Sequence, residues 1–267
     1  MDNRPIGVFD SGLGGLTVVR QLFAALPHER IVYLGDTARV PYGSRSPDIV
    51  RKFARQDAYF LAGRNVKYIV VACNTASAQA EPDLVRRLDI PVLGVIEPGA
   101  AAAVRTSASG RIGVIGTLGT IASGAYQRAI LAHQPTAQVV AHACPLFVPL
   151  AEEAAQDTQA ARLIAHDYLH PFLDGNVDTL ILGCTHYPIL ETVIAQTVGP
   201  DVCLLDPGIA LAQALVTDLA RRGLLAAGDQ PVEHQYFVTD RSVRFQELAE
   251  RFLGHRLCST VEQVDLD

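Results

Sequence analysis

The sequence lacks the features that direct a chain to a membrane or to secretion. No apolar run is long enough to span a bilayer, and the N-terminus "MDNRPIGVFD" has no charged start followed by the apolar segment of a secretory signal. Five cysteines, an odd number at wide spacings, do not suit a disulfide framework and fit a reducing compartment. The sequence therefore predicts a cytoplasmic protein with no membrane partner.

Positive charge is also scarce, with 22 Lys and Arg against 28 Asp and Glu, a formal net charge of −6 and no Lys/Arg cluster. Phosphate neutralisation needs a concentrated positive stripe, so nucleic acid is not an expected partner. Only Lys52 and Lys67 are present, and neither follows an expected strand, where pyridoxal phosphate would need a Schiff-base lysine. We expect a reaction without a cofactor.

What the sequence does contain is a regular alternation of short β-branched runs and amphipathic stretches. The runs occupy residues 6–9, 31–35, 68–73, 91–96, 112–116, 138–143, 179–184 and 202–206. Stretches between them, such as 48–63 and 159–173, are long enough for right-handed crossover helices. The alternation predicts an α/β fold of doubly wound parallel sheets.

The runs also pair in order, as an internal duplication with a period near 110 residues. "IGVFDSGLGG" matches "IGVIGTLGT", and "VIEPGAAAA" matches "LLDPGIALA". We predict two pseudo-symmetric lobes, residues 1–97 plus 207–267 and residues 98–206, with a packing helix at 240–253 in the first. Since ligands bind beyond the carboxyl ends of parallel strands, the active site is expected between the lobes.

One matched pair of runs ends in cysteine: "YIVVACNTAS" (68–77) and "TLILGCTHYP" (179–188). If the lobes face each other, Cys73 and Cys184 approach one ligand from opposite sides. A thiol between a strand and a helix start lies near backbone N–H groups, which lower its pKa from about 8.5 toward the physiological range. Two such thiols could remove a proton from one face of a carbon and return one to the other, which inverts it.

The cysteines could instead have a packing, metal-binding or hydrolytic role. Free cysteine is often simply buried, and Cys144, Cys203 and Cys258 are expected to pack in this way. The spacing of Cys184 and His186 is not a usual zinc pattern, so no metal is expected. A Cys-His hydrolase needs only one cysteine, and an amino-acid-binding protein needs neither. The duplication favours the two-thiol reaction.

The turn "DSGLGGLTV" near the N-terminus has glycines that permit close backbone approach to a ligand before a helix start. It is not a Walker motif, because no Gly-Lys-Ser/Thr follows. Asp10 in this turn could have a functional role, or it could simply cap the helix that follows.

Five segments together resemble the glutamate racemases of the aspartate/glutamate racemase family: "FDSGLGGLTV", "GDTARVPYGSRS", "VVACNTAS", "CPLFVPLAEE" and "LILGCTHYP". The cysteine motifs alone are typical of a wider group that includes aspartate and hydantoin racemases. "DSGLGG" and "PYGS" favour glutamate over aspartate, which is the alternative substrate. The resemblance implies cofactor-independent interconversion of L- and D-glutamate, with D-glutamate supplied to peptidoglycan synthesis.

The resemblance also assigns roles. Cys73 would deprotonate D-glutamate with support from Asp10, and Cys184 would deprotonate L-glutamate. His186 and Glu152, with Glu153 as the alternative to Glu152, would support the second thiol. The implied substrate-binding residues are Asp10, Ser11, Tyr42, Gly43, Ser44, Asn74, Thr75, Thr117, Thr185 and His186. Hydroxyls and backbone N–H groups hold anions without a lysine or arginine that would overbind the ground state. A homodimer is a further possibility that the resemblance allows.

Overall fold

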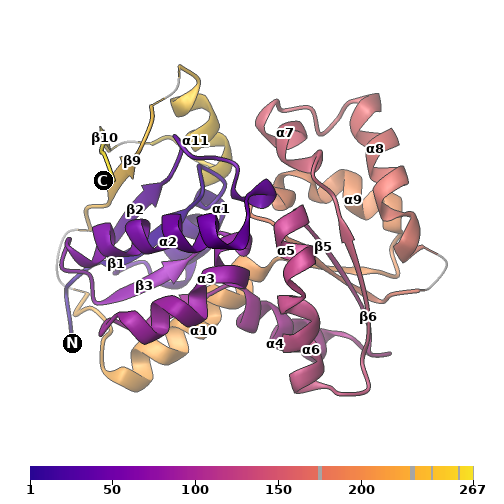
Figure 1. Ribbon diagram of the computed structural model, residues 1–267, viewed down its shortest axis with the longest axis horizontal. Helices are drawn as coiled ribbons and strands as arrows, with labels where there is room; N and C mark the ends of the chain where they lie inside the picture. The colour runs from indigo at the N-terminus through magenta and orange to yellow at the C-terminus, as the bar shows by residue number, and fades with distance from the viewer. Residues whose placement is uncertain (174–175, 229–231, 242, 258, 267) are drawn as a thin grey trace.

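The structure, a computed structural model, describes residues 1–173, 176–228, 232–241, 243–257 and 259–266. This part of the chain folds into two parallel β-sheets that lie side by side, each flanked by helices (Figure 1). Both termini lie at the lobe built on the first sheet. The predicted α/β class with two doubly wound lobes is confirmed.

The first sheet has the strand order β10-β9-β2-β1-β3-β4, with all pairings parallel. Its strands are β1 (Ile6–Asp10), β2 (Ile31–Gly35), β3 (Tyr68–Val71), β4 (Val92–Gly94), β9 (Gln235–Val238) and β10 (Val261–Gln263). One face packs on α1 (Leu16–Ala25), α10 (Pro207–Arg222) and α11 (Phe245–Leu253). The other face packs on α2 (Pro47–Ala62) and α3 (Asn74–Arg87).

The second sheet has the order β6-β5-β7-β8, again parallel. Its strands are β5 (Arg111–Gly116), β6 (Gln138–Ala143), β7 (Thr179–Gly183) and β8 (Cys203–Leu205). Its helices are α4 (Ile96–Thr106), α5 (Leu118–Ser123), α6 (Ala125–His133), α7 (Phe147–Glu152), α8 (Gln159–Leu169) and α9 (Glu191–Val198). This order repeats the β2-β1-β3-β4 part of the first sheet, as the sequence duplication predicts. Short 3-10 helices are η1 (Tyr42–Ser44), η2 (His170–Phe172) and η3 (Tyr187–Leu190).

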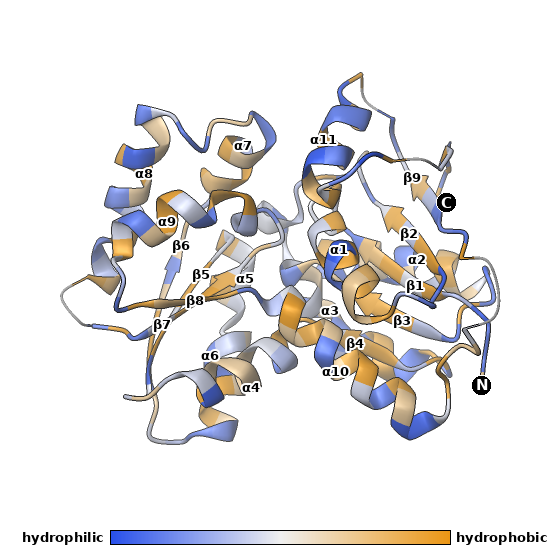
Figure 2. Cartoon of the chain, turned by 180° about the vertical axis from the view of Figure 1, so that it is seen from behind, coloured by the Kyte–Doolittle hydropathy of each residue, from blue (hydrophilic) through white to orange (hydrophobic). Residues whose placement is uncertain are grey.

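Local sequence explains where the long helices begin and end. In α10, Asp206 caps the first turn by accepting from the Gly208 N–H at 2.7 Å, and Pro207 occupies the first helical position. The helix ends at Gly223, whose φ of 69° is left-handed and suits glycine. Apolar residues concentrate in the strands, with hydrophilic residues on the outer turns of helices such as α8 and α11 (Figure 2).

The two lobes meet where α4 and α10 pack against each other. At this junction a Cβ added to Gly99 would lie 3.0 Å from Pro207 Cβ, so the matched "EPG" and "DPG" turns are in close contact. The exact division of the chain into residues 1–97 plus 207–267 and 98–206 stays a prediction. No helix among the described residues has the length and apolar character to cross a membrane.

Three details differ from the sequence predictions. The helix expected to start at Asp240 starts at Phe245, and Val243, expected to pack, is fully exposed. Cys203 is exposed, because it opens the short edge strand β8, whereas Cys144 is buried as expected. Cys258 lies outside the described residues. Strands β9 and β10 were not anticipated, since their runs are short and lack strict alternation.

Candidate active site

A small cavity of about 30 Å³ lies between the lobes, at the carboxyl ends of β1, β3 and β7. Both Cys73 and Cys184 line it, one from each sheet, as the duplication predicts. Its remaining wall residues are Ser11, Val40, Pro41, Tyr42, Gly43, Asn74, Thr75, Thr117, Val148, Thr185 and His186.

Cys73 follows β3 and caps the N-terminus of α3, where its Sγ accepts from the Ala76 N–H at 3.4 Å. Its thiol donates to the Ser11 hydroxyl at 3.6 Å. Burial, followed by the negative charge of Asp10, raises the pKa of Cys73 to about 12. The Ala76 N–H acts in the opposite direction, as does the Ser11 hydroxyl when it donates to the thiolate. The expected lowering of this pKa by the helix start is therefore wrong, because desolvation of a buried thiolate outweighs it.

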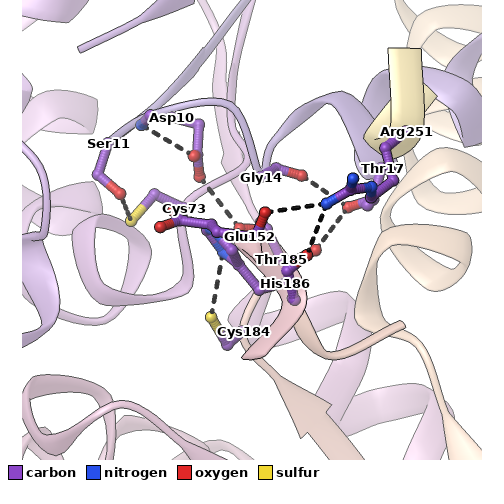
Figure 3. Close-up of polar contacts among 12 residues, drawn as sticks. Asp10, Ser11, Gly14, Thr17, Cys73, Glu152, Cys184, Thr185, His186 and Arg251 are labelled. Carbon is purple, nitrogen blue, oxygen red and sulfur yellow. Dashed lines mark hydrogen bonds and ion pairs between the residues drawn. The ribbon is translucent and has the colours of Figure 1, made fainter. Parts of the chain in front are cut away.

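Cys184 follows β7 and lies beside His186, with Sγ 3.8 Å from Nδ1. The opposite ring nitrogen, Nε2, lies 3.0 Å from Oε1 of Glu152 at the end of α7 (Figure 3). Burial lowers the pKa of His186, but the hydrogen bonds to Cys184 and Glu152 outweigh it and raise this pKa to about 10. The imidazole is thus charged at neutral pH and donates at both nitrogens, one of them toward a sulfur.

A polar chain joins the surroundings of the two thiols. Asp10 is fully buried at the end of β1 and accepts from the Gly12 N–H at 3.0 Å. The Thr185 hydroxyl lies 3.5 Å from Asp10 Oδ1 and 3.4 Å from His186 Nδ1. Burial raises the pKa of Asp10, against the lowering effect of charged His186 and the backbone donors. Asp10 does not cap α1, which has no side-chain cap, and it reaches across to Thr185 of the second lobe instead.

The glycine-rich turn allows this approach. A Cβ added to Gly14 would lie 2.4 Å from Thr185 Oγ1 and 2.6 Å from His186 Nδ1, closer than real Cβ contacts. Thr17 fixes the same contact, because its hydroxyl lies 2.9 Å from Gly14 O and 3.0 Å from Thr185 O (Figure 3). The sequence predicts close backbone approach toward a ligand, whereas the structure shows it toward the loop that carries the second thiol.

Comparison with known proteins identifies the family. Residues 6–215 match the family described as Asp/Glu/Hydantoin racemase. The chain belongs to the Asp/Glu/hydantoin racemase family. The glutamate racemase of Geobacter metallireducens is 50% identical over 99% of this chain and 97% of its own length.

Solved structures of this racemase family agree over the whole chain. A glutamate racemase isoform from Bacillus anthracis has a TM-score of 0.95 and 41% identity, covering 100% of this chain and 99% of that one. The glutamate racemase of Francisella tularensis, in complex with D-glutamate, has a TM-score of 0.94 at 41% identity, with the same coverage.

In this racemase-family chain, hydroxyl and amide groups form one wall of the cavity. The Asn74 side-chain oxygen accepts from the Tyr126 hydroxyl at 2.7 Å, so its NH₂ group is left as a donor for a ligand. The Thr75 and Thr117 hydroxyls lie 2.9 Å apart, and both contact Thr120. These contacts join α3 of the first lobe to α5 and α6 of the second. Neither Tyr126 nor Thr120 was anticipated. Tyr126 lies in no recognisable motif, and Thr120 ends the matched segment "IGVIGTLGT", whose pairing indicates the duplicated fold and not the site residues.

Tyr42 lines the cavity but directs its hydroxyl into the first lobe. The hydroxyl contacts Asp36 and, at 2.9 Å, Asp57, and Arg39 pairs with both carboxyl groups. A phenol carries one hydrogen, so only one carboxyl can accept from it and the other must donate. Burial, followed by the negative charge of Asp36, raises the pKa of Asp57 well above its usual range. Burial therefore favours the protonated form of Asp57, and the network holds Tyr42 of η1 in place.

In two pairs of adjacent predicted residues, Gly43 with Ser44 and Glu152 with Glu153, the two members have different surroundings. Gly43 lines both the cavity and an adjacent groove of about 480 Å³, whereas Ser44 is exposed and lines the groove but not the cavity. Glu153 points away from His186 and pairs with Arg244 at 2.8 Å, so Glu152 is the glutamate that contacts the imidazole. Within the described residues, no group of three His, Cys, Asp or Glu side chains could hold a metal ion.

Proposed function

We propose that this chain interconverts L- and D-glutamate by a two-thiol mechanism that uses Cys73 and Cys184. The observation that carries the proposal is the position of these thiols. They come from equivalent strand ends of two lobes and line one buried cavity. Full-length similarity to glutamate racemases, at 50% identity for the Geobacter metallireducens protein, supports glutamate as the substrate.

In the L-to-D direction, the Cys184 thiolate takes the Cα proton and the C–H electron pair stays on Cα. The Cys73 thiol then gives its proton to the opposite face of the carbon. The step leaves Cys184 as a thiol and Cys73 as a thiolate, with D-glutamate formed. The reverse direction exchanges the two roles, and neither direction needs an oxidant or a reductant.

The electrostatics of the cavity suit the start of the L-to-D direction. With its pKa raised to about 12, Cys73 holds its proton at neutral pH and is ready as the acid. Charged His186 donates toward Cys184 and stabilises negative charge on that sulfur. The ammonium group of glutamate would bring positive charge close to Asp10 and Cys73, and this would favour the Cys73 thiolate that the step produces.

Substrate entry requires the lobes to separate. A cavity of about 30 Å³ accommodates one or two water molecules, whereas glutamate is several times larger. We infer that the lobes open at the contact between η1 and α5 and close again around the substrate. Closure excludes water and strengthens the stabilisation of the carbanion.

The test is proton NMR of L-glutamate in deuterated buffer, with purified protein and no added cofactor. We expect loss of the Cα–H signal together with growth of D-glutamate, and loss of both in Cys73→Ser and in Cys184→Ser. Cys203→Ser is the matched control, because Cys203 is exposed and outside the cavity, and it should retain activity. Exchange with aspartate but not glutamate would overturn the substrate assignment. Full activity of either cavity variant would overturn the two-thiol mechanism.

The thiols also bear on where the protein works in the cell, and the origin of the site residues bears on its assembly. Reactive thiols must stay reduced, which supports a cytoplasmic location, where D-glutamate would supply peptidoglycan synthesis. A homodimer is also proposed as the assembly, to be checked by sedimentation velocity. All residues in the mechanism come from one chain, so the chemistry would not depend on it.

A further inference from the structure

Helix α11 reaches from the first lobe to α7 of the second. Arg251 donates from Nη1 to the backbone oxygen of Glu152 at 2.9 Å and to that of Ala151 at 3.4 Å (Figure 3). Arg244 reaches the same Glu152 oxygen at 3.4 Å. In both ribbon views α11 lies at the edge of the first lobe that faces α7 of the second lobe (Figures 1 and 2).

These contacts lie at the C-terminal end of α7, where the Ala151 oxygen also accepts from the Ala154 N–H at 3.3 Å. Helix α7 spans only Phe147–Glu152, and the last carbonyls of a helix lack intrahelical partners. An arginine at such an end supplies donors and a favourable charge. The side chain of Arg251 is 21% exposed against 42% for Arg244, so Arg251 is the better shielded of the two donors. The Glu152 backbone is thereby tied to the first lobe.

Phe252, the next residue of α11, contacts His186, whose ring contacts the Glu152 side chain. Phe252 is fully buried, and its ring lies edge-on to His186 with the centroids 5.0 Å apart. Adjacent residues of one helix therefore hold Glu152 through its backbone and His186 through its ring. The 3.0 Å contact between His186 and Glu152 joins these two residues.

We propose that Arg251 and Phe252 are positioning residues that hold the His186–Glu152 pair and so tune proton transfer at Cys184. The inference rests on the proposed two-thiol function. It makes α11 an element of the second half of the active site, although its helix packs on the first sheet.

The loss of Arg251 should affect proton transfer at only one of the two thiols. The partners of Cys73 are Ser11, the Ala76 N–H and nearby Asp10, which lie on β1, the turn after it and α3. The hydrogen bonds of Arg251 go instead to α7 and to Glu247 within α11. Loss of Arg251 should slow proton transfer at Cys184 and leave transfer at Cys73 unchanged.

The experiment compares Arg251→Ala with wild type using glutamate deuterated at Cα. The enantiomers have equal free energy, so kcat/KM must fall equally in both directions, by between about tenfold and about 100-fold. The substrate isotope effect should rise with L-glutamate, whose deuteron Cys184 removes, and fall with D-glutamate. Arg251→Lys, which keeps one donor, should restore part of the loss. Glu247→Gln is the matched control, since it removes the pairs of Glu247 with Arg251 and with Arg244 and leaves both arginine side chains in place.

A second readout needs no substrate. NMR titration of the His186 ring, assigned by its loss in His186→Asn, should show its pKa falling from about 10 in Arg251→Ala and in Phe252→Leu. An unchanged ring titration with unchanged isotope effects would overturn the proposal. If Arg251→Ala does not fold, Arg251→Gln replaces it. Should wild type fail to racemise glutamate, the proposed function fails, while the titration still decides the positioning role.

Discussion

Nε2 of His186 lies 3.0 Å from Oε1 of Glu152, while Nδ1 of the same ring lies 3.8 Å from the Cys184 sulfur. The ring thus connects a half-exposed carboxylate to a buried thiol. These two contacts overcome the effect of burial and raise the pKa of His186 to about 10. Cys73 instead has the Ser11 hydroxyl, the Ala76 N–H and the negative charge of Asp10 around it. The two halves of the site are therefore chemically unequal in spite of the duplicated fold.

Glu152→Gln tests this relationship through the pH dependence of activity. The substitution removes one of the contacts that raise the pKa of His186, so the ring loses its charge at lower pH. Activity that requires the charged ring is lost as pH rises through this pKa. The alkaline limb of kcat/KM should therefore move below its wild-type position near pH 10.

Glu153→Gln is the matched control for that profile, because Glu153 pairs with Arg244 at the surface. We expect its pH profile to match wild type. A shift in Glu153→Gln with none in Glu152→Gln would reverse the assignment of the supporting glutamate.

Gly14→Ala should strongly slow racemisation with little change in secondary structure. Its new Cβ would lie 2.4 Å from Thr185 Oγ1 and 2.6 Å from His186 Nδ1, so the loop behind Cys184 must move. We expect kcat/KM to fall by about 100-fold or more. Gly63→Ala is the control, since its Cβ would meet ordinary contacts at 3.4 Å and 3.6 Å. Normal activity of Gly14→Ala would show that the second lobe is not held against this turn.

Much of this site could be predicted from the sequence because its residues lie at strand ends. The apolar runs before Cys73 and Cys184 fix where each strand stops, and the duplication indicates that the two ends are equivalent. The depth of burial is not a local property. A helix start follows Cys73 as predicted, yet desolvation raises its pKa instead of lowering it.

Contacts between distant segments were the other part that the sequence could not reveal. Arg251 and Phe252 belong to an amphipathic helix, and such a pattern indicates packing without naming the partner. Arg251 meets Glu152 across 99 positions of sequence. Tyr126 likewise meets Asn74 only because the lobes close on each other. The pattern of apolar and polar residues within one segment does not say which distant segment it will contact.

The buried Asp36–Tyr42–Asp57 network predicts different outcomes for two similar substitutions. In the protonated form that burial favours, Asp57 donates to the Tyr42 hydroxyl. An asparagine amide can do the same, so Asp57→Asn should change the free energy of unfolding by less than about 1 kcal/mol. Asp36 accepts from Arg39 at both oxygens, at 2.9 Å and 2.7 Å. Asp36→Asn should cost about 2 kcal/mol, because Arg39 loses a charged partner. Urea unfolding at pH 7 measures both, and a larger loss in Asp57→Asn would show that Asp57 is the ionised carboxyl.

Gly43 contacts the start of α5 and lines the cavity, whereas its neighbour Ser44 lines the outer groove and not the cavity. A Cβ added to Gly43 would lie 2.6 Å from Thr117 Cβ at the start of α5, so Gly43→Ala should hold η1 away from α5. We expect it to raise KM and lower kcat, each by about tenfold, because closure becomes incomplete. Ser44 is exposed and lies outside the cavity, so Ser44→Ala should leave both constants within about twofold of wild type. Steady-state kinetics in both directions measure the pair. A large rise of KM in Ser44→Ala would instead mean that Ser44 turns inward when glutamate binds and holds its side-chain carboxylate.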